Sequence, residues 1–191
     1  MLSRALVVVL LIAVAVGIDL KAIKPKEGNV IYNALNPAIS YSGRVKVNSS
    51  GSVQYDWSNI KIKTTFQGTT LSLILKDYGN MYNVYIDEKL VQLITTKQTG
   101  SVTTYPISTV PSGVHKLVVA KRTEAFVGGV VEFMGFEAGS DTKLLPSHQP
   151  KDIRRVEFIG DSITCSYGVL GKFPCDFSAA TEDVLKGYGQ L

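Results

Sequence analysis

Apolar and polar residues alternate along most of the chain between Val30 and Glu137. Segments such as "IKIKTTF" and "LSLILK" repeat with a period of about two residues, which is typical of β-strands with one face in a core and one in water. Short turn sequences, including "NSSG", "DYGN" and "PSG", separate these segments. About eight such strands, with no helical period between them, predict an antiparallel β-sandwich of the jelly-roll type over residues 22–138.

The same alternation predicts which side chains enter the core, because successive side chains of a strand point to opposite faces. Lys61 and Lys63 are expected to face water. Trp57 stands at the end of a strand and is predicted to be a core residue rather than a sugar-stacking platform. The apolar residues expected to point inward in the two segments quoted above are Ile60, Ile62, Phe66, Leu71, Leu73 and Leu75.

The pattern changes after the last alternating segment. Residues 139–152 are rich in Gly, Ser, Asp and Pro, which predicts a linker. "RRVEFIG" then reads as a buried strand that ends at Gly160, and Ser178 or Thr181 could cap the start of a helix. A strand, a loop and a helix are a usual beginning of an α/β domain. The predicted fold class is therefore mainly β, a jelly-roll sandwich followed by a truncated α/β start in residues 153–191.

The N-terminus has the composition of a secretory signal. Arg4 is followed by an uncharged run from Ala5 to Ile18, which is short for a membrane span of about 20 residues. Small residues near Gly17 suit signal peptidase. Residues 1–17 are predicted to be a cleaved signal peptide, so that the mature protein is extracellular and not held in a membrane; an uncleaved anchor is the alternative.

Composition narrows the function classes. The apolar share of 45% and the charged share of 19% fit a globular protein with a substantial core. The formal net charge is +4, and the basic residues are scattered rather than clustered. Because nucleic-acid-binding proteins concentrate Lys and Arg in a patch, the sequence predicts no nucleic-acid partner.

Secretion changes how the two cysteines are interpreted. In an oxidising compartment Cys165 and Cys175 are candidates for a disulfide. Two cysteines and two distant histidines are too few for a structural zinc site, so no metal is expected. The sequence Asn48-Ser-Ser is an N-glycosylation sequon in a predicted turn, which matters only in a eukaryotic host.

Ser162 is the candidate nucleophile. It follows Gly160 and Asp161 directly after the predicted strand "RRVEFIG". Ligands bind beyond the carboxyl ends of strands in α/β domains, and backbone N–H groups there can stabilise a developing negative charge. Glycine permits a sharp turn at such a place. A serine hydroxyl is a weak nucleophile, however, and it still needs a neighbouring base.

The segment "FIGDSITCSYG" resembles the first conserved block of the GDSL/SGNH hydrolases, and more closely the "GDSITCGYG" block of carbohydrate esterase family 2, the acetylxylan esterases. "YNVYIDEKLV", "VHKLVVAKRTEAFVGGVVEFMGFE" and "KLLP" are similar to the N-terminal jelly roll and linker of that family, and "CDFSAATEDVLKGYGQL" is similar to the segment after its nucleophile. The resemblance covers roughly residues 40–191.

This resemblance implies a serine esterase that removes O-acetyl groups from xylan, glucomannan or a related polysaccharide. Ser162 would be the nucleophile, its backbone N–H would contribute to the oxyanion hole, and Asp161 would hold the turn. No metal or organic cofactor is implied. Ser166 stands where the family usually has Gly, and we expect a minor effect unless the position requires a positive φ.

The family also requires a histidine base and further oxyanion residues on later strands. The residues after Ser162 contain no His and no Asn, and the only histidines are His115 and His148. His115 opens a predicted strand of the sandwich, and His148 lies in the predicted linker with nothing to orient it. We therefore expect an N-terminal fragment of a longer esterase, nearly inactive by itself.

Two further interpretations remain open. The sandwich could be a non-catalytic carbohydrate-binding module that holds polysaccharide through exposed aromatic residues such as Tyr78, Tyr82 or Tyr85, although alternating Tyr residues also occur in ordinary strand packing. It could also be a secreted structural domain with a disordered tail.

Overall fold

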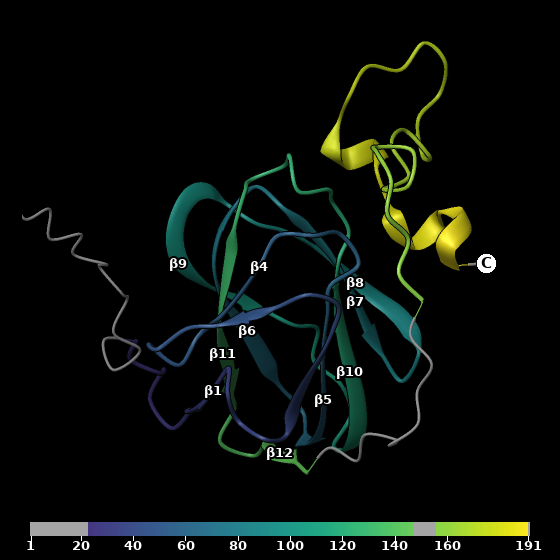
Figure 1. Cartoon of the computed structure of the whole chain (residues 1–191). Coiled ribbons are helices and arrows are strands. Elements are labelled where there is room, and N and C mark those ends of the chain that lie inside the picture. Colours follow the sequence, from purple (N-terminus) through teal and green to yellow (C-terminus); the bar gives the residue numbers. More distant parts are fainter. Residues whose placement is uncertain (1–22, 147–155, 191) are drawn as a thin grey trace, which may run out of the picture.

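The computed structural model describes residues 23–146 and 156–190. Two antiparallel sheets face each other and form a β-sandwich, and a C-terminal segment lies at one end of it (Figure 1). The prediction of a mainly β sandwich is confirmed. The predicted signal peptide and His148 lie outside the described residues. In the part of the chain that the structure describes, no helix is long and apolar enough to cross a membrane.

The first sheet has six strands in the order β3-β4-β11-β6-β9, with β1 also paired to β11. Its bounds are β1 Val30–Asn33, β3 Lys46–Val47, β4 Val53–Tyr55, β6 Leu71–Tyr78, β9 Gln98–Pro106 and β11 Val131–Ala138.

The second sheet also has six strands, in the order β12-β5-β10-β7-β8, with β2 paired to β5. Its bounds are β2 Ile39–Ser42, β5 Lys61–Gly68, β7 Met81–Ile86, β8 Lys89–Thr95, β10 Gly113–Lys121 and β12 Lys143–Leu145. Strands distant in the sequence thus meet in both sheets.

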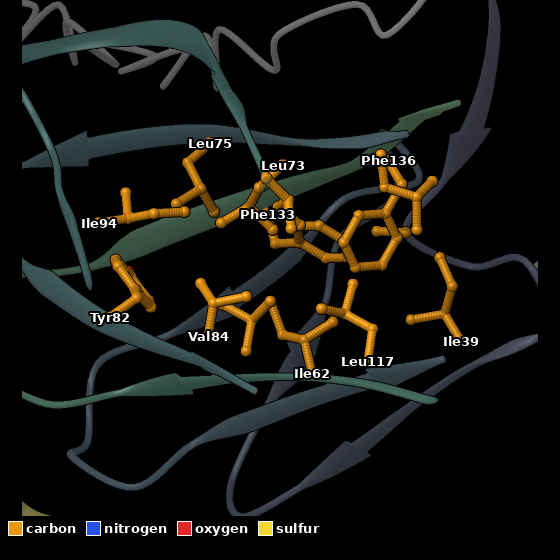
Figure 2. Close-up of a cluster of buried hydrophobic side chains, with 14 of the residues drawn as sticks. Ile39, Ile62, Leu73, Leu75, Tyr82, Val84, Ile94, Leu117, Phe133 and Phe136 are labelled. Atoms are coloured by element: carbon orange, nitrogen blue, oxygen red, sulfur yellow. The ribbon is translucent and has the colours of Figure 1, made fainter. Parts of the chain in front are cut away.

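Apolar side chains of the two inner faces fill the space between the sheets (Figure 2). Strand β5 alternates between buried and partly exposed positions almost without interruption, as the period of two predicts. The predicted inward residues are confirmed, since all of them are buried: Ile60, Ile62, Phe66, Leu71, Leu73 and Leu75. Burying each such side chain contributes on the order of 2 kcal/mol.

A bulge in β11 places two phenylalanines in the same core. Phe133 and Phe136 are an odd number of residues apart, so a regular strand would point them to opposite faces. The register of β11 against β6 shifts between Phe133 and Gly135, and the two rings then pack edge to face at 5.2 Å. Gly135 has a φ of +142°, and a Cβ there would collide with the Tyr32 carbonyl. Only glycine fits this bulge.

Two features of the C-terminal half differ from the prediction. The linker predicted at 139–152 begins too early, because Lys143–Leu145 form β12 and pair with β5. The predicted strand before Ser162 is not formed over residues 156–160. Val156 and Ile159 are 77% and 85% exposed, and no described strand pairs with this segment. A central strand of an α/β sheet requires neighbours on its edges, and the segment has none among the described residues.

The helix predicted near the C-terminus is replaced by three short 3₁₀ turns, η2 Ala179–Thr181, η3 Val184–Lys186 and η4 Tyr188–Gln190. Ser178 does act as an N-cap, because its side chain accepts a hydrogen bond from the Ala180 N–H. η2 and η3 are each followed by a residue with extended backbone, Glu182 and Gly187, rather than by a further helical turn. The α/β start is thus present as a loop with capped turns.

The hairpin between β7 and β8 is anchored to β10. Asp87 and Glu88 form its two-residue turn, with φ values of +51° and +67°. One carboxylate oxygen of Asp87 accepts a hydrogen bond from the Lys116 N–H at 2.9 Å, and the other lies 2.7 Å from Nδ1 of His115. Nε2 of His115 lies 2.9 Å from the Pro111 carbonyl. Because both ring nitrogens face acceptors, the protonated imidazolium is favoured, and the hydrogen bond to Asp87 raises the pKa of His115.

We predict that Asp87→Asn lowers the pKa of His115, because it removes the carboxylate while keeping a residue that tolerates the left-handed backbone. The pair stabilises the wild type fully between the unfolded pKa of Asp, about 3.9, and the unfolded pKa of His, about 6.5. This contribution is lost as the pH rises through the raised pKa of His115. It is also lost as the pH falls through the lowered pKa of Asp87.

NMR titration of the His115 ring, assigned with His115→Gln, measures this pKa. Glu88→Gln changes the neighbouring turn residue without touching the pair and should leave the pKa as it is. An unchanged pKa in Asp87→Asn would show that the carboxylate does not control the imidazole.

Candidate nucleophile turn

Asp161 organises the turn that carries Ser162. Its Oδ1 accepts a hydrogen bond from the Ile163 N–H at 3.0 Å, and its backbone carbonyl accepts from the N–H groups of Thr164 and Cys165. The Ser162 carbonyl in turn accepts from the Tyr167 N–H at 2.9 Å. The carboxylate therefore closes an Asx-type turn, the holding role expected of Asp161.

Ser162 is partly exposed on this turn. Within the described residues, neither its hydroxyl nor its backbone N–H makes a hydrogen bond. The N–H is thus available to an outside acceptor, as an oxyanion-hole donor must be. Gly160 directly precedes the turn and lies close to Thr164. A Cβ at position 160 would collide with the Thr164 hydroxyl. This close packing against Thr164 requires glycine at position 160.

The described residues do not bring a histidine base to Ser162. Both ring nitrogens of His115 are occupied by Asp87 and the Pro111 carbonyl at the start of β10. The carboxylate of Asp161 is engaged with the Ile163 N–H. The prediction that His115 is a structural residue beside a turn agrees with these contacts.

A buried arginine attaches the C-terminal segment, residues 156–190, to the sandwich. Arg122 follows β10 directly and is only 6% exposed. Its guanidinium donates to the backbone carbonyls of Glu182 and Ala180, the latter at 2.8 Å. Its own carbonyl accepts from the Val184 N–H at 3.3 Å. Four hydrogen-bonding groups of the backbone are thus paired across the boundary between sandwich and segment.

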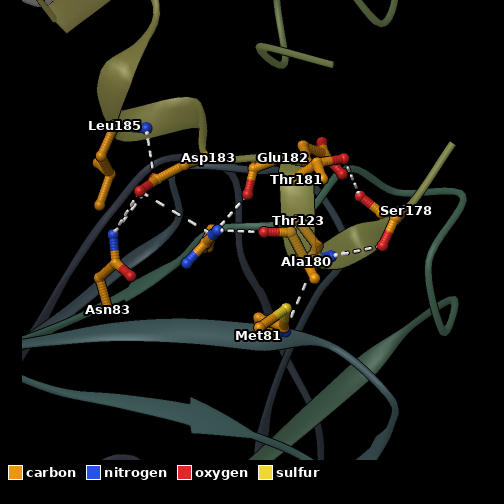
Figure 3. Close-up of polar contacts among 10 residues, drawn as sticks. Met81, Asn83, Thr123, Ser178, Ala180, Thr181, Glu182, Asp183 and Leu185 are labelled. Atoms are coloured by element: carbon orange, nitrogen blue, oxygen red, sulfur yellow. Dashed lines mark hydrogen bonds and ion pairs between the residues drawn. The ribbon is translucent and has the colours of Figure 1, made fainter. Parts of the chain in front are cut away.

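Asp183 reinforces this attachment (Figure 3). It is buried, its carboxylate lies 3.9 Å from Nε of Arg122, and the Asn83 amide donates to both of its oxygens at 3.2 Å. Asp183 also caps η3 by accepting from the Leu185 N–H. We call the surface formed by Asn83, Lys121, Arg122 and residues 180–184 the junction.

Further contacts connect the nucleophile turn to the junction. The Thr164 hydroxyl lies 2.8 Å from that of Tyr188, and the Leu170 N–H donates to the Thr181 carbonyl at 2.9 Å. Sγ of Cys165 lies 3.4 Å from the Ser58 hydroxyl, which belongs to the sandwich. The turn that carries Ser162 is therefore held from two sides.

The junction buries charges of both signs. Lys121 is fully buried, and its ammonium donates to the carbonyls of Thr123 and Glu124. Burial lowers the pKa of Lys121 to about 8. Glu182 is also fully buried, and its burial, with the charge of Glu124 next, raises the pKa of Glu182 to about 7.

Both cysteines of the predicted disulfide are free thiols in this structure, and their pairing stays a prediction. Cys165 contacts Ser58 of the sandwich, whereas the thiol of Cys175 donates to the Asp176 carbonyl at 3.5 Å. The two side chains thus have separate partners. The glycosylation of Asn48 stays a prediction; its amide nitrogen now donates to the side chains of Ser52 and Glu132.

Ser166 occupies a left-handed position, with a φ of +66°. Position 166 therefore does require a positive φ, which is the condition under which we expect Ser in place of the usual Gly to matter. Its side chain is buried against Gly187, and its hydroxyl has no hydrogen-bond partner within the described residues. Both the backbone conformation and the unpaired hydroxyl cost stability.

The aromatic residues differ from their predicted positions. Trp57 is 56% exposed, so its assignment to the core is wrong: it lies in the loop after β4, where the alternation of the strand no longer applies. Tyr82 is 1% exposed and donates to Asp77, which removes it as a sugar-binding candidate. Tyr78 is exposed and Tyr85 is half-buried.

Trp57 borders a shallow groove of mixed polarity. The other residues that line it are Arg44, Val45, Lys46, Gln54, Tyr55, Asp56 and Val130. An exposed indole with charged and amide groups around it can stack on an apolar face and hydrogen-bond to a polar rim. The sequence does not reveal this groove, because its residues come from β3, β4 and separate loops.

Comparison with known proteins identifies relatives of the chain. Residues 41–147 match the family model described as carbohydrate esterase 2 N-terminal. The chain is 39% identical over 137 residues to the cellulase/esterase CelE of Acetivibrio thermocellus, a match that covers 71% of this chain and 16% of the relative. It is 34% identical over 131 residues to an acetylxylan esterase / glucomannan deacetylase of Cellvibrio japonicus, covering 66% of this chain and 34% of the relative.

Among solved structures, a family two carbohydrate esterase from Clostridium thermocellum in complex with cellohexaose has a TM-score of 0.73 and 32% identity. That match covers 80% of this chain and 46% of the solved one. The chain thus spans less than half the length of each of these relatives.

We predict that Ser166→Gly stabilises the nucleophile turn by about 1 kcal/mol. It removes a left-handed strain of about 1 kcal/mol and an unpaired buried hydroxyl, while the extra freedom of unfolded glycine offsets part of the gain. Ser166→Ala removes the hydroxyl but keeps the strain, so it should be less stable than the Gly variant. Hydrogen exchange of residues 161–170 measures the difference, and equal protection in the two variants would contradict the strain.

Proposed function

The chain belongs to carbohydrate esterase family 2, whose N-terminal domain it matches over residues 41–147, and we propose that Ser162 is the nucleophile of a secreted esterase that deacetylates plant polysaccharide. The observation that carries this proposal is the partly exposed Ser162 on a turn closed by Asp161, with its backbone N–H unpaired among the described residues. The similarity to esterases supports the reaction class.

In the proposed reaction, Oγ of Ser162 attacks the carbonyl carbon of an O-acetyl group. The carbonyl oxygen becomes an oxyanion, which the Ser162 N–H stabilises together with donors outside the described residues. A general base takes the Ser162 hydroxyl proton during the attack and returns it to the sugar oxygen as the bond between the acyl carbon and that oxygen breaks, so that the sugar leaves as a hydroxyl. Water cleaves the acetyl-serine to give acetate and free Ser162.

Acetylated xylan and glucomannan are the proposed substrates, because the relative from Cellvibrio japonicus is named for both activities. The uncharged run near the N-terminus supports secretion, which places the protein with such extracellular polymers. The proposed chemistry requires a base to take the serine proton. His115 is committed to Asp87 and the Pro111 carbonyl, and we propose that His148, which lies outside the described residues, does not serve because nothing in its sequence neighbourhood orients it. Residues 1–191 alone are therefore proposed to be nearly inactive, since a general base contributes about 10²–10⁴-fold in rate.

We predict that added imidazole restores part of this missing step. With p-nitrophenyl acetate, the chain alone should hydrolyse within about twofold of Ser162→Ala. In the presence of imidazole, the wild type should hydrolyse the ester at least about threefold faster than Ser162→Ala. The rate of Ser162→Ala corrects for direct hydrolysis by imidazole. A threefold gain is a small part of what a positioned base supplies. Initial rates against imidazole concentration measure the effect.

Ser166→Ala serves as the matched control, because it removes a buried serine of the same turn and should keep the imidazole response. An equal response in wild type and Ser162→Ala would show that Ser162 is not a nucleophile. Fast Ser162-dependent hydrolysis without imidazole would show that the chain carries its own base.

Carbohydrate binding without catalysis is a second candidate function, which the exposure of Trp57 beside a groove favours. Affinity electrophoresis on xylan and glucomannan tests it. Trp57→Ala should reduce the retardation and raise the Kd derived from it at least about tenfold, as expected when a central aromatic contact is lost.

Tyr78→Ala removes an aromatic residue of similar exposure that does not line the groove, and it should bind normally. Unretarded wild type would remove this second function. Loss of retardation in Tyr78→Ala alone would move the binding site away from the groove.

A further inference from the structure

Three side chains with metal-binding atoms meet behind the nucleophile turn. Glu124 lies in the loop between β10 and β11, Cys165 lies in the nucleophile turn, and Glu182 is the C-cap residue directly after η2. Their ligand atoms all lie within 4.8 Å of one another. The three residues are separated in sequence and are brought together only by the attachment of the C-terminal segment to the sandwich.

Glu182 shows that this cluster differs from an ordinary group of surface acids. Its side chain is fully buried, and neither carboxylate oxygen has a hydrogen bond of good geometry within the described residues. The Glu124 backbone N–H lies near enough to lower the pKa of Glu182 somewhat, but it does not offset the effect of burial. Leaving a buried polar group unpaired is costly, and nearly all such groups in native proteins have a partner. Both carboxylate oxygens of Glu182 are therefore buried without the hydrogen-bond donor or cation that such oxygens normally contact.

We propose that Glu124, Cys165 and Glu182 bind a divalent metal ion of the zinc class. A thiolate with two carboxylates is a donor set that zinc accepts, and the sulfur ligand disfavours magnesium and calcium, which take oxygen ligands. Three protein ligands leave a fourth tetrahedral position for water.

The geometry requires only a small adjustment. Donors bound to a tetrahedral zinc at about 2.0–2.3 Å lie about 3.5 Å apart. The three atoms lie within 4.8 Å of one another, so no pair has to approach by more than about 1.3 Å. Glu124 and Cys165 are half-buried rather than locked, so side-chain rotation can supply this movement.

The charges of the cluster also favour a cation. Two carboxylates and a thiolate together carry three negative charges, which a divalent ion and the neighbouring Lys121 would balance. The Lys121 ammonium donates to the carbonyls of Thr123 and Glu124, not to the carboxylate oxygens. The lysine therefore contributes its charge nearby without occupying the position of the metal.

The bound ion would join three parts of the molecule. Cys165 follows Ser162 by one turn, and its N–H already donates to the Asp161 carbonyl. A metal held by Cys165 would link the nucleophile turn to Glu124 of the sandwich and Glu182 of the C-terminal segment. This role is structural, because the ion stabilises the position of the turn rather than reacting with substrate.

Cobalt binding provides the test. Tag-free chain, stripped with EDTA and kept under a non-thiol reductant, is titrated with Co²⁺ and then with Zn²⁺. We expect one Co²⁺ per chain, a thiolate-to-cobalt charge-transfer absorption, and displacement of cobalt by zinc. Zinc at about 100 times its Kd should also raise the melting temperature, because it binds the folded state.

Variants separate the proposed site from others. Cys165→Ser should abolish the absorption and weaken binding at least about tenfold, whereas Cys175→Ser should change neither. Glu182→Gln should weaken binding at least about tenfold but keep the absorption at saturating cobalt, and Glu88→Gln in the β7–β8 turn should bind normally. Circular dichroism confirms that each variant is folded.

Absence of saturable binding in the wild type would overturn the proposal. So would binding that survives Cys165→Ser, or absorption that disappears in Cys175→Ser. Each result reports on the metal alone and does not depend on esterase activity, so failure here is distinguishable from failure of the proposed function.

Discussion

The buried guanidinium of Arg122 is the contact on which the position of the nucleophile turn depends. Taking a charged side chain out of water is expensive unless its donors are paired. Arg122 meets this requirement with the carbonyls of Ala180 and Glu182 and with the carboxylate of Asp183. The C-terminal segment has little regular structure of its own, so these bonds supply much of what orders it against the sandwich.

The same burial determines the electrostatics of the junction. Once the segment covers the end of β10, Lys121 and Glu182 lie in a medium that disfavours both of their charged forms, and their pKa values move toward each other. The neighbouring carboxylate of Asp183 has partners, because Asn83 donates to both of its oxygens and Arg122 lies beside it. Glu182 has no such partner within the described residues, and this difference between adjacent acids makes Glu182 the unusual one.

How far the sequence predicts this molecule depends on the range of the interactions involved. The alternation of β5 is local, and it correctly places Ile62 and Phe66 in the core. Phe136 reaches the same core only through the bulge at Gly135, which a period of two does not contain. The same pattern fails for Trp57, which stands just beyond β4 and is exposed. The pairing of Arg122 with Glu182 spans 60 residues and has no local signal.

The same distinction applies to the chemistry of Ser162. Its identity as a candidate nucleophile rests on a short segment, and the structure shows in that segment a self-contained turn whose Asp161 and Gly160 have local steric and hydrogen-bonding roles. The predicted strand before it did not form over the described residues, because a strand in an α/β sheet depends on neighbours rather than on its own sequence. A turn can form from its own hydrogen bonds, whereas a general base must come from a segment that is distant in the sequence. The turn that presents Ser162 therefore forms without the base that would activate the serine. A base would have to be positioned relative to the junction, which fixes this turn on the sandwich.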